Sequence, residues 1–236
     1  MKGKGRVNRG WTKLHRWKKA QFAEKKSYNH SVETWWSTDT SKQYLLTNFG
    51  IDMELFRNKK VLEVGGGLGL INFIDVPCFR VGIDPLYHYL RPKLRNSTAH
   101  LITGIGESLP FNTNVFDICL CLNVLDHCIE PEEVLKEIKR VLKNGGLLIF
   151  HLNTFELPRF LLSKLSLIDP PHPHHFSSKQ IIALIRKFGF EIIQVKETKP
   201  PIFAKWKNFI AFLLFRFRVV YIVARLAKEG SKEYES

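Results

Sequence analysis

A glycine-rich turn after an apolar run is the feature that most restricts what this chain can fold into. The stretch Val61–Gly69 reads Val-Leu-Glu-Val-Gly-Gly-Gly-Leu-Gly, and a second apolar run ends at Asp84. A strand, a glycine turn and a second strand that ends in an acid are typical of a nucleoside cofactor bound across two parallel strands. The sequence therefore predicts an open α/β sheet with a ligand site at the carboxyl ends of its strands.

The spacing of the glycines distinguishes two kinds of cofactor. A dinucleotide site requires glycine at positions 65, 67 and 70, but position 70 is Leu. Glu63 precedes the turn, and its charge would repel a pyrophosphate. S-adenosylmethionine fits better, because it carries a sulfonium, an ammonium, a ribose and an adenine but no phosphate. A nicotinamide-dependent oxidoreductase is the alternative that Leu70 and Glu63 weigh against.

Four segments occur in an order that resembles a known family. They are Val61–Gly69, Val81–Pro85, Glu107–Phe111 with Phe116-Asp117 following, and Arg140–Gly146. The stretch from Val61 to Phe150 resembles the class I S-adenosylmethionine-dependent methyltransferases of the ubiquinone/menaquinone-methyltransferase-like superfamily. The resemblance implies an α/β fold with a Rossmann-like, doubly wound, seven-stranded sheet whose last strand is antiparallel.

Alternating apolar runs and helix signals support that fold class. Helix start signals stand at Pro131, which is followed by two glutamates, and at Ser177, which forms a capping-box pattern with Gln180. We predict helices at 11–28, 40–49, 131–142 and 177–189, and strands at 60–64, 80–84, 100–103, 116–122, 147–152, 190–195 and 219–224. On the first helix, an apolar stripe with basic residues opposite is expected at Leu14, Trp17, Ala20 or Gln21, and Phe22.

Basic residues concentrate near the ends of the chain. The net charge is +14, yet residues 1–26 hold ten Lys or Arg and one acid, and residues 201–228 hold six and none. We predict a disordered basic tail at 1–10, an N-terminal helical lid at 11–50, and a methyltransferase domain at 51–228 with a helical, aromatic-rich cover at 202–217. The cover is interrupted too often for a bilayer span, and it could instead contact an anionic membrane surface.

The resemblance implies which residues bind the cofactor. Asp84 would accept both ribose hydroxyl protons, with a strand-end cap as its alternative role. Many relatives have Asp where Ile105 stands, so either the backbone or Glu107 would bind the adenine. The implied cofactor-binding residues are Glu63, Gly65, Gly66, Gly67, Gly69, Asp84, Pro85, Gly106, Glu107 and Asn123.

Three residues are candidates for acid–base catalysis. A base is needed only if the acceptor is a hydroxyl or similar weak acid. His127, with Asp126 beside it, follows a predicted strand, and His151 ends another. A helix-capping role is the alternative for His127. The histidines of the segment 170–176 resemble a part of the family that closes over the acceptor pocket, and we predict no metal there because three histidines on a proline-rich loop rarely converge.

The acceptor is the least defined part of the prediction. Trp17–Glu24 and Trp35-Trp36 resemble a lid of members that act in surface-sugar biosynthesis, which favours a small-molecule, glycan or lipid-linked acceptor. RNA is the alternative acceptor, because a basic tail would engage phosphates. A non-catalytic binding protein is the third option, motivated by Ile105. The four cysteines show no zinc-like spacing and the first residues no apolar signal segment, so we expect reduced thiols and a cytoplasmic protein.

Overall fold

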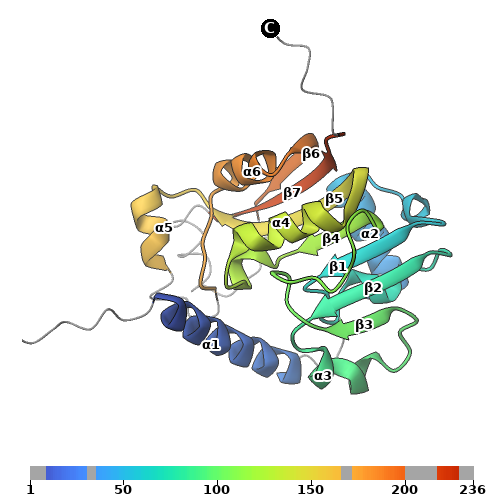
Figure 1. Cartoon of the computed structure of the whole chain (residues 1–236), viewed down its shortest axis with the longest axis horizontal. Coiled ribbons are helices and arrows are strands. Elements are labelled where there is room, and N and C mark those ends of the chain that lie inside the picture. The colour runs from blue at the N-terminus through green and yellow to red at the C-terminus, as the bar shows by residue number, and fades with distance from the viewer. Residues whose placement is uncertain (1–8, 31–35, 166–171, 200–216, 229–236) are drawn as a thin grey trace, which may run out of the picture.

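A mixed seven-stranded sheet forms the centre of the protein. The structure is a computed structural model that describes residues 9–30, 36–165, 172–199 and 217–228. The strand order is β3-β2-β1-β4-β5-β7-β6 (Figure 1). The first five strands of that order pair in parallel, and β7 is antiparallel to both of its neighbours, β5 and β6. The predicted Rossmann-like sheet with an antiparallel last strand is confirmed.

Three strands have the bounds expected from the sequence, and four extend beyond them. The strands are β1 (Lys60–Val64), β2 (Phe79–Asp84), β3 (His100–Thr103), β4 (Phe116–Leu122), β5 (Leu142–Phe155), β6 (Phe190–Thr198) and β7 (Phe217–Leu226). The largest difference is in β5, where Phe116 pairs with Leu142 and the ladder resumes only at Ile118 and Leu147. Residues 143–146 therefore form an irregular insertion, which includes Gly145 with φ +79°.

Helices connect the strands on both faces of the sheet. The α-helices are α1 (Arg9–His30), α2 (Thr38–Phe49), α3 (Tyr87–Leu90), α4 (Pro131–Val141), α5 (Arg159–Leu165) and α6 (Ser178–Lys187). Short 3-10 turns are η1 (Met53–Phe56), η2 (Leu70–Phe73), η3 (Arg91–Leu94) and η4 (Leu125–His127). The capping box between Ser177 and Gln180 is confirmed by reciprocal hydrogen bonds of 2.9 and 3.3 Å. A second capping box, between Ser37 and Thr40, starts α2 two residues earlier than expected.

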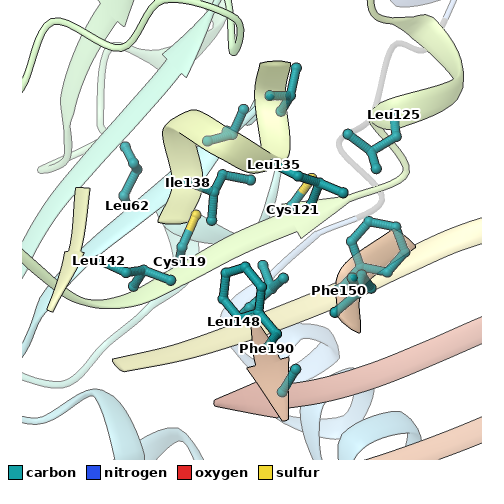
Figure 2. Packing of buried hydrophobic residues seen from close by; sticks show 14 of the residues in the cluster. Leu62, Cys119, Cys121, Leu125, Leu135, Ile138, Leu142, Leu148, Phe150 and Phe190 are labelled. Atoms are coloured by element: carbon teal, nitrogen blue, oxygen red, sulfur yellow. The ribbon is translucent and has the colours of Figure 1, made fainter. Parts of the chain in front are cut away.

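One hydrophobic layer lies between the sheet and helices α4 and α6, which Figure 1 shows in front of the sheet. The α4 side chains at 134, 135, 138 and 141 follow helical spacing and are fully buried. Figure 2 shows Leu135 and Ile138 over Cys119 and Cys121 of β4. All four cysteines are free, as predicted, and the cysteines of β4 fill the core as small apolar side chains.

The opposite layer is built by α2, η1 and η2. Leu45 and Phe49 of α2 pack with Phe56 of η1 and Ile71 of η2 against the other face of the strands. The helices of the two layers cover both faces of the sheet. Because the first five strands are parallel, the loops that follow them meet at one edge, at the carboxyl ends of the strands.

Part of the predicted domain organisation lies outside the described residues. The tail at 1–10 overlaps them only at residues 9 and 10, which begin α1, and the cover at 202–217 only at Phe217, which begins β7. A predicted apolar stripe on the first helix is wrong at Phe22, whose surface is 72% exposed. Among the helices that the structure describes, none has both the length and the apolar character needed to cross a membrane.

Candidate cofactor and acceptor site

A cleft of about 270 Å³ lies at the carboxyl ends of β1, β2, β3 and β4. The loops that follow these four strands line the cleft, and α1 lines it as well. The site therefore lies where the chain reverses direction across the sheet, which is the usual ligand position in open α/β folds. Ten predicted site residues line the cleft: Glu63, Gly65, Gly66, Gly69, Asp84, Pro85, Gly106, Glu107, Asn123 and His127.

The glycine turn depends on glycine at several positions. Gly65 and Gly67 have φ of +69° and +45°, in the left-handed region. A Cβ on Gly66 would collide with the hydroxyl of Tyr87, and one on Gly67 with the hydroxyl of Tyr28. The turn thus presents bare backbone at the cleft, although Gly67 itself does not line it.

Asp84 holds the turn in place and also faces the cleft. One carboxylate oxygen accepts the Gly67 N–H at 3.0 Å, and the other accepts the Leu86 N–H at 2.7 Å. A carboxylate has about four acceptor positions, so two remain for ligand hydroxyls. Burial raises the pKa of the Asp84 carboxyl to about 6.

Glu63 lies deeper than Asp84 under the same turn. Its carboxylate accepts the Ile71 N–H at 2.7 Å, which ties η2 to β1, and burial raises its pKa to about 8. Glu24 and Glu107 add two more carboxyl groups to the lining. Within the described residues no Lys or Arg lines the cleft, so a cationic ligand suits it better than a phosphate.

The turn after β3 forms the end of the cleft expected to bind adenine. Ile105, Gly106 and Glu107 all line the cleft. The Glu107 carboxylate accepts the N–H groups of Ile129 at 2.7 Å and Glu130 at 3.2 Å. Glu107 therefore ties this turn to the loop that starts α4, a role that sequence reasoning missed.

Asn123 leaves β4 at a strained position. Its φ is +60°, its N–H donates to the carbonyl of His151 at 2.7 Å, and its buried side-chain oxygen has no hydrogen-bond partner among the described residues. Asn123 lines the cleft, and a buried polar atom without a partner is available to a ligand; its cofactor-binding role stays a prediction.

An imidazole–carboxylate cluster lies beside the cleft, at the end where we expect the acceptor. We call it the His/Asp cluster and define it as Asp126, His127 and His172; of the three, His127 lines the cleft. The Nε2 atom of His127 lies 3.8 Å from Asp126 Oδ1 and 3.7 Å from Glu24 Oε1, and His172 Nε2 lies 3.9 Å from Asp126 Oδ2. The His127 and His172 rings are 4.5 Å apart. Sequence reasoning identified the neighbours Asp126 and His127, but it did not bring His172 to them.

His151, the third predicted catalytic residue, does not line the cleft. Its Nδ1 is 3.0 Å from the Tyr44 hydroxyl, and its ring stacks on Tyr221 at 5.1 Å. Burial lowers its pKa to about 4. The register of β5 places His151 on the α2 face, opposite Phe150, so its surroundings favour packing; its catalytic role stays a prediction.

Helix α1 supplies the residues of the site that were hardest to predict. Trp17, Gln21, Glu24 and Tyr28 recur at helical spacing and all line the cleft. Burial raises the pKa of Tyr28, and the nearby carboxylate of Asp84 raises it further. Trp36, the described member of the predicted Trp pair, also lines the cleft. We expected the buried face of this helix to be an apolar stripe, whereas the face that lines the cleft carries both polar and aromatic side chains.

Comparison with known proteins agrees with this geometry. A family model described as a methyltransferase domain matches residues 62–150. An uncharacterised methyltransferase of Mycolicibacterium gilvum is 35% identical over 98 residues, which cover 39% of this chain and 38% of that protein. The rice chloroplastic 2-methyl-6-phytyl-1,4-hydroquinone methyltransferase 1 is 29% identical over 158 residues, covering 62% of this chain and 44% of the relative. The chain thus matches less than half the length of either relative.

Solved structures extend the likeness to the whole sheet. An S-adenosylmethionine-dependent methyltransferase from Mesorhizobium loti superposes with a TM-score of 0.57 at 16% identity, covering 72% of this chain and 92% of the other. At this identity the likeness concerns the fold. With the domain match, the strand order and the position of the cleft, it makes the chain a member of the class I S-adenosylmethionine-dependent methyltransferase superfamily.

Proposed function

We propose that this protein transfers a methyl group from S-adenosylmethionine to a hydroxyl oxygen of a small-molecule, glycan or lipid-linked acceptor. The observation that carries the proposal is a cleft lined by Glu24, Glu63, Asp84 and Glu107, onto which His127 also opens. A negative cleft attracts a sulfonium cofactor, and an imidazole beside it can take a proton from a hydroxyl.

The residues present fit the cofactor. The backbone of Gly65–Gly69 allows close approach, Asp84 has acceptor positions left for a ribose, and Ile105 and Leu86 give apolar walls suited to adenine. Glu24 supplies negative charge for the ammonium and the sulfonium, and a cation bound beside Glu63 would favour the ionised form of that residue against its raised pKa. When bound, the cofactor supplies a methyl group on a positively charged sulfur and leaves as a neutral thioether.

The protein's own part in the reaction is alignment and removal of a proton. Such displacements gain most of their acceleration from holding the reactants in line. His127 would accept the proton of the acceptor hydroxyl at Nε2, which lies within 4 Å of the carboxylates of Asp126 and Glu24. Trp17 and Tyr28 of α1 would close the cleft and exclude water.

The outer face of α1 supports an acceptor at a membrane surface. Phe22 is the most exposed large apolar side chain described, and Lys18, Lys19 and Lys26 are exposed around it. Cations around an exposed aromatic side chain are typical of helices that lie on anionic lipid. The rice relative is named for an acceptor with a phytyl chain, which is consistent with a lipid-linked acceptor.

RNA is the second candidate acceptor. Helix α1 contains one acid, Glu24, and that residue faces the cleft, so the charged side chains described on its outer face are all basic. Such a face would also bind phosphates, with an affinity that falls steeply as salt rises.

Labelling of fractionated extracts tests the proposal. Purified protein and methyl-labelled cofactor are incubated with lipid, sugar, RNA and protein fractions, with the Asp84→Asn variant as the inactive control. Label in the lipid or sugar fraction, absent with the variant, is expected, and label confined to RNA would select the second candidate. Calorimetry separates the non-catalytic alternative, because a protein that does not bind S-adenosylmethionine or its demethylated product cannot be a methyltransferase of this kind.

A further inference from the structure

The His/Asp cluster has the composition of a metal site. Asp126 and His127 belong to η4, directly after β4, and His172 comes from the segment that leads to α6. One ligand atom from each residue can be chosen so that all three lie within 4.8 Å of one another. Two imidazoles and one carboxylate on one side of a cleft are a common ligand set for first-row divalent transition metals.

Asp126 is the residue whose environment most needs an explanation. It is 4% exposed, and its Oδ1 atom has no hydrogen-bond partner among the described residues. Over the same part of the chain, the two imidazoles are the only basic groups within 4.0 Å of its carboxylate. A buried carboxylate requires a cation or hydrogen-bond donors. A metal ion between Asp126 and the two histidines would meet that requirement.

The segment that carries His172 is fixed to η4 by its own backbone. The N–H of His174 donates to the backbone carbonyl of Asp126 at 3.2 Å, and the His174 ring lies 3.0 Å from the carbonyl oxygen of Cys128. His174 is thus a structural neighbour that holds the segment, whereas His172, two residues before it, reaches the carboxylate. This is the arrangement expected of a ligand supported by surrounding hydrogen bonds.

We propose that Asp126, His127 and His172 bind one divalent transition-metal ion at the acceptor end of the cleft. Metal–ligand bonds of about 2.1 Å place neighbouring ligand atoms about 3.0 to 3.5 Å apart. The observed separations are 3.8 and 3.9 Å to the two different carboxylate oxygens of Asp126, and at most 4.8 Å when one atom is taken from each residue, so side-chain rotations would have to shorten them by up to about 1.8 Å. The carboxyl group of Glu24 lies 3.7 Å from His127 Nε2 but outside the group of mutually close ligand atoms, so it would accept a hydrogen bond from a metal-bound water and would not bind the ion itself.

The role of the metal in the reaction rests on the proposed function, whereas the test of metal binding does not depend on it. A metal at this position would bind the acceptor oxygen and lower the pKa of its hydroxyl. The proton would then pass to the Glu24 carboxylate, 3.7 Å from His127 Nε2, and His127 would act as a ligand and not as the base. The acceptors it favours are those with a hydroxyl beside a second oxygen, since two oxygens can chelate one ion.

Metal binding is measured on the purified, metal-stripped full chain without cofactor or acceptor. Titration with Mn²⁺ by calorimetry and with Co²⁺ by visible absorption is expected to show one site. The His172→Ala variant, at a partly exposed position, should bind at least about tenfold more weakly. His100→Ala, which removes an exposed histidine from β3, is the matched control and should bind as wild type does. A thermal melt of each variant verifies folding.

Three results would overturn the proposal: no binding of either ion at millimolar concentration, equal binding by His172→Ala and wild type, or loss of binding in the His100→Ala control. Failure of the proposed function looks different. In that case S-adenosylmethionine would not bind to wild type with or without metal, while the metal titration could still succeed.

Discussion

Replacing Asp84 by Asn tests whether one buried carboxylate serves both the fold and the cofactor. Burial raises its folded pKa to about 6, from about 3.9 in an unfolded chain. Between those values the folded protein binds more protons than the unfolded one, so this group makes stability fall as pH rises from about 4 to about 6. At about 1.36 kcal/mol per unit, the ionised Asp84 costs the wild-type protein about 3 kcal/mol of stability at pH 7.

The Asp84→Asn variant should not lose stability in this way, because its side chain does not ionise. Asn keeps one acceptor oxygen, so one of the N–H groups of Gly67 and Leu86 loses its acceptor, at a cost of about 1 to 3 kcal/mol that does not depend on pH. The free energy of unfolding of Asp84→Asn minus that of wild type should therefore rise by about 2 to 3 kcal/mol between pH 4 and pH 7. Urea unfolding at several pH values measures this difference, and a difference that stays constant across that range would refute the burial argument.

Cofactor affinity should change in the opposite sense. Hydrogen bonds to a charged group contribute about 1.5 to 3 kcal/mol each, so Asp84→Asn is expected to bind S-adenosylmethionine about 10- to 1,000-fold more weakly at pH 7. Wild-type affinity should fall up to about tenfold per unit below pH 6 as the carboxyl group protonates, and the variant should lose that dependence. Calorimetry from pH 5 to 8 measures both, and a variant that binds as tightly as wild type would remove Asp84 from the ribose site.

Three further substitutions test the turn, the loop clamp and the core. Gly67→Ala places a Cβ against the Tyr28 hydroxyl at φ +45° and should weaken cofactor binding at least about tenfold in calorimetry; Gly145→Ala has a similarly positive φ but open surroundings outside the cleft and should leave affinity unchanged. Arg140→Lys removes the guanidinium group whose two N–H groups donate to the carbonyls of Leu109 and Phe111, and it should lower the free energy of unfolding by about 1 to 3 kcal/mol. An unchanged urea midpoint would show that these two hydrogen bonds do not contribute to stability. Leu135→Ala in the α4 layer should cost about 2 to 5 kcal/mol, against about 0.5 kcal/mol or less for the exposed Leu46→Ala on α2, and equal costs would contradict the core assignment.

Features encoded by neighbouring residues were predictable from the sequence. The strand Phe116–Leu122 was predicted at both ends because a strand buried on both faces is a continuous apolar run. Asp84 and the glycines were predictable for the same reason, since a turn and the acid that binds its N–H groups are local in the sequence. The insertion in β5 was not, because the glycines that favour a turn there also tolerate an irregular strand.

Contacts between distant segments were the part that could not be predicted. Asp126 and His172 lie 46 positions apart, and hydrogen bonds of His174 to the backbone carbonyls of Asp126 and Cys128 bring the two segments together. The prediction of no metal considered only whether the histidines of segment 172–175 could bind one ion together. In the structure, His172 instead lies near Asp126 and His127 of η4. Likewise, Phe22 was assigned to the buried face of α1 because it is apolar, whereas the residues on the cleft face include Glu24 and Gln21.

Helix α1 reconciles a basic N-terminal region with an acidic site. Successive side chains on a helix are rotated by about 100°, so Glu24 projects into the cleft with Trp17 and Tyr28, while Lys18 and Lys26 project away from it. Glu24 would then lie close to a cationic cofactor in the cleft, and the lysines of the same helix would lie away from that cofactor. An anionic surface that binds the outer face would hold α1 from outside while its inner face covers the cofactor. Under the proposed function, acceptor delivery and closure of the cleft would therefore be coupled through a single helix.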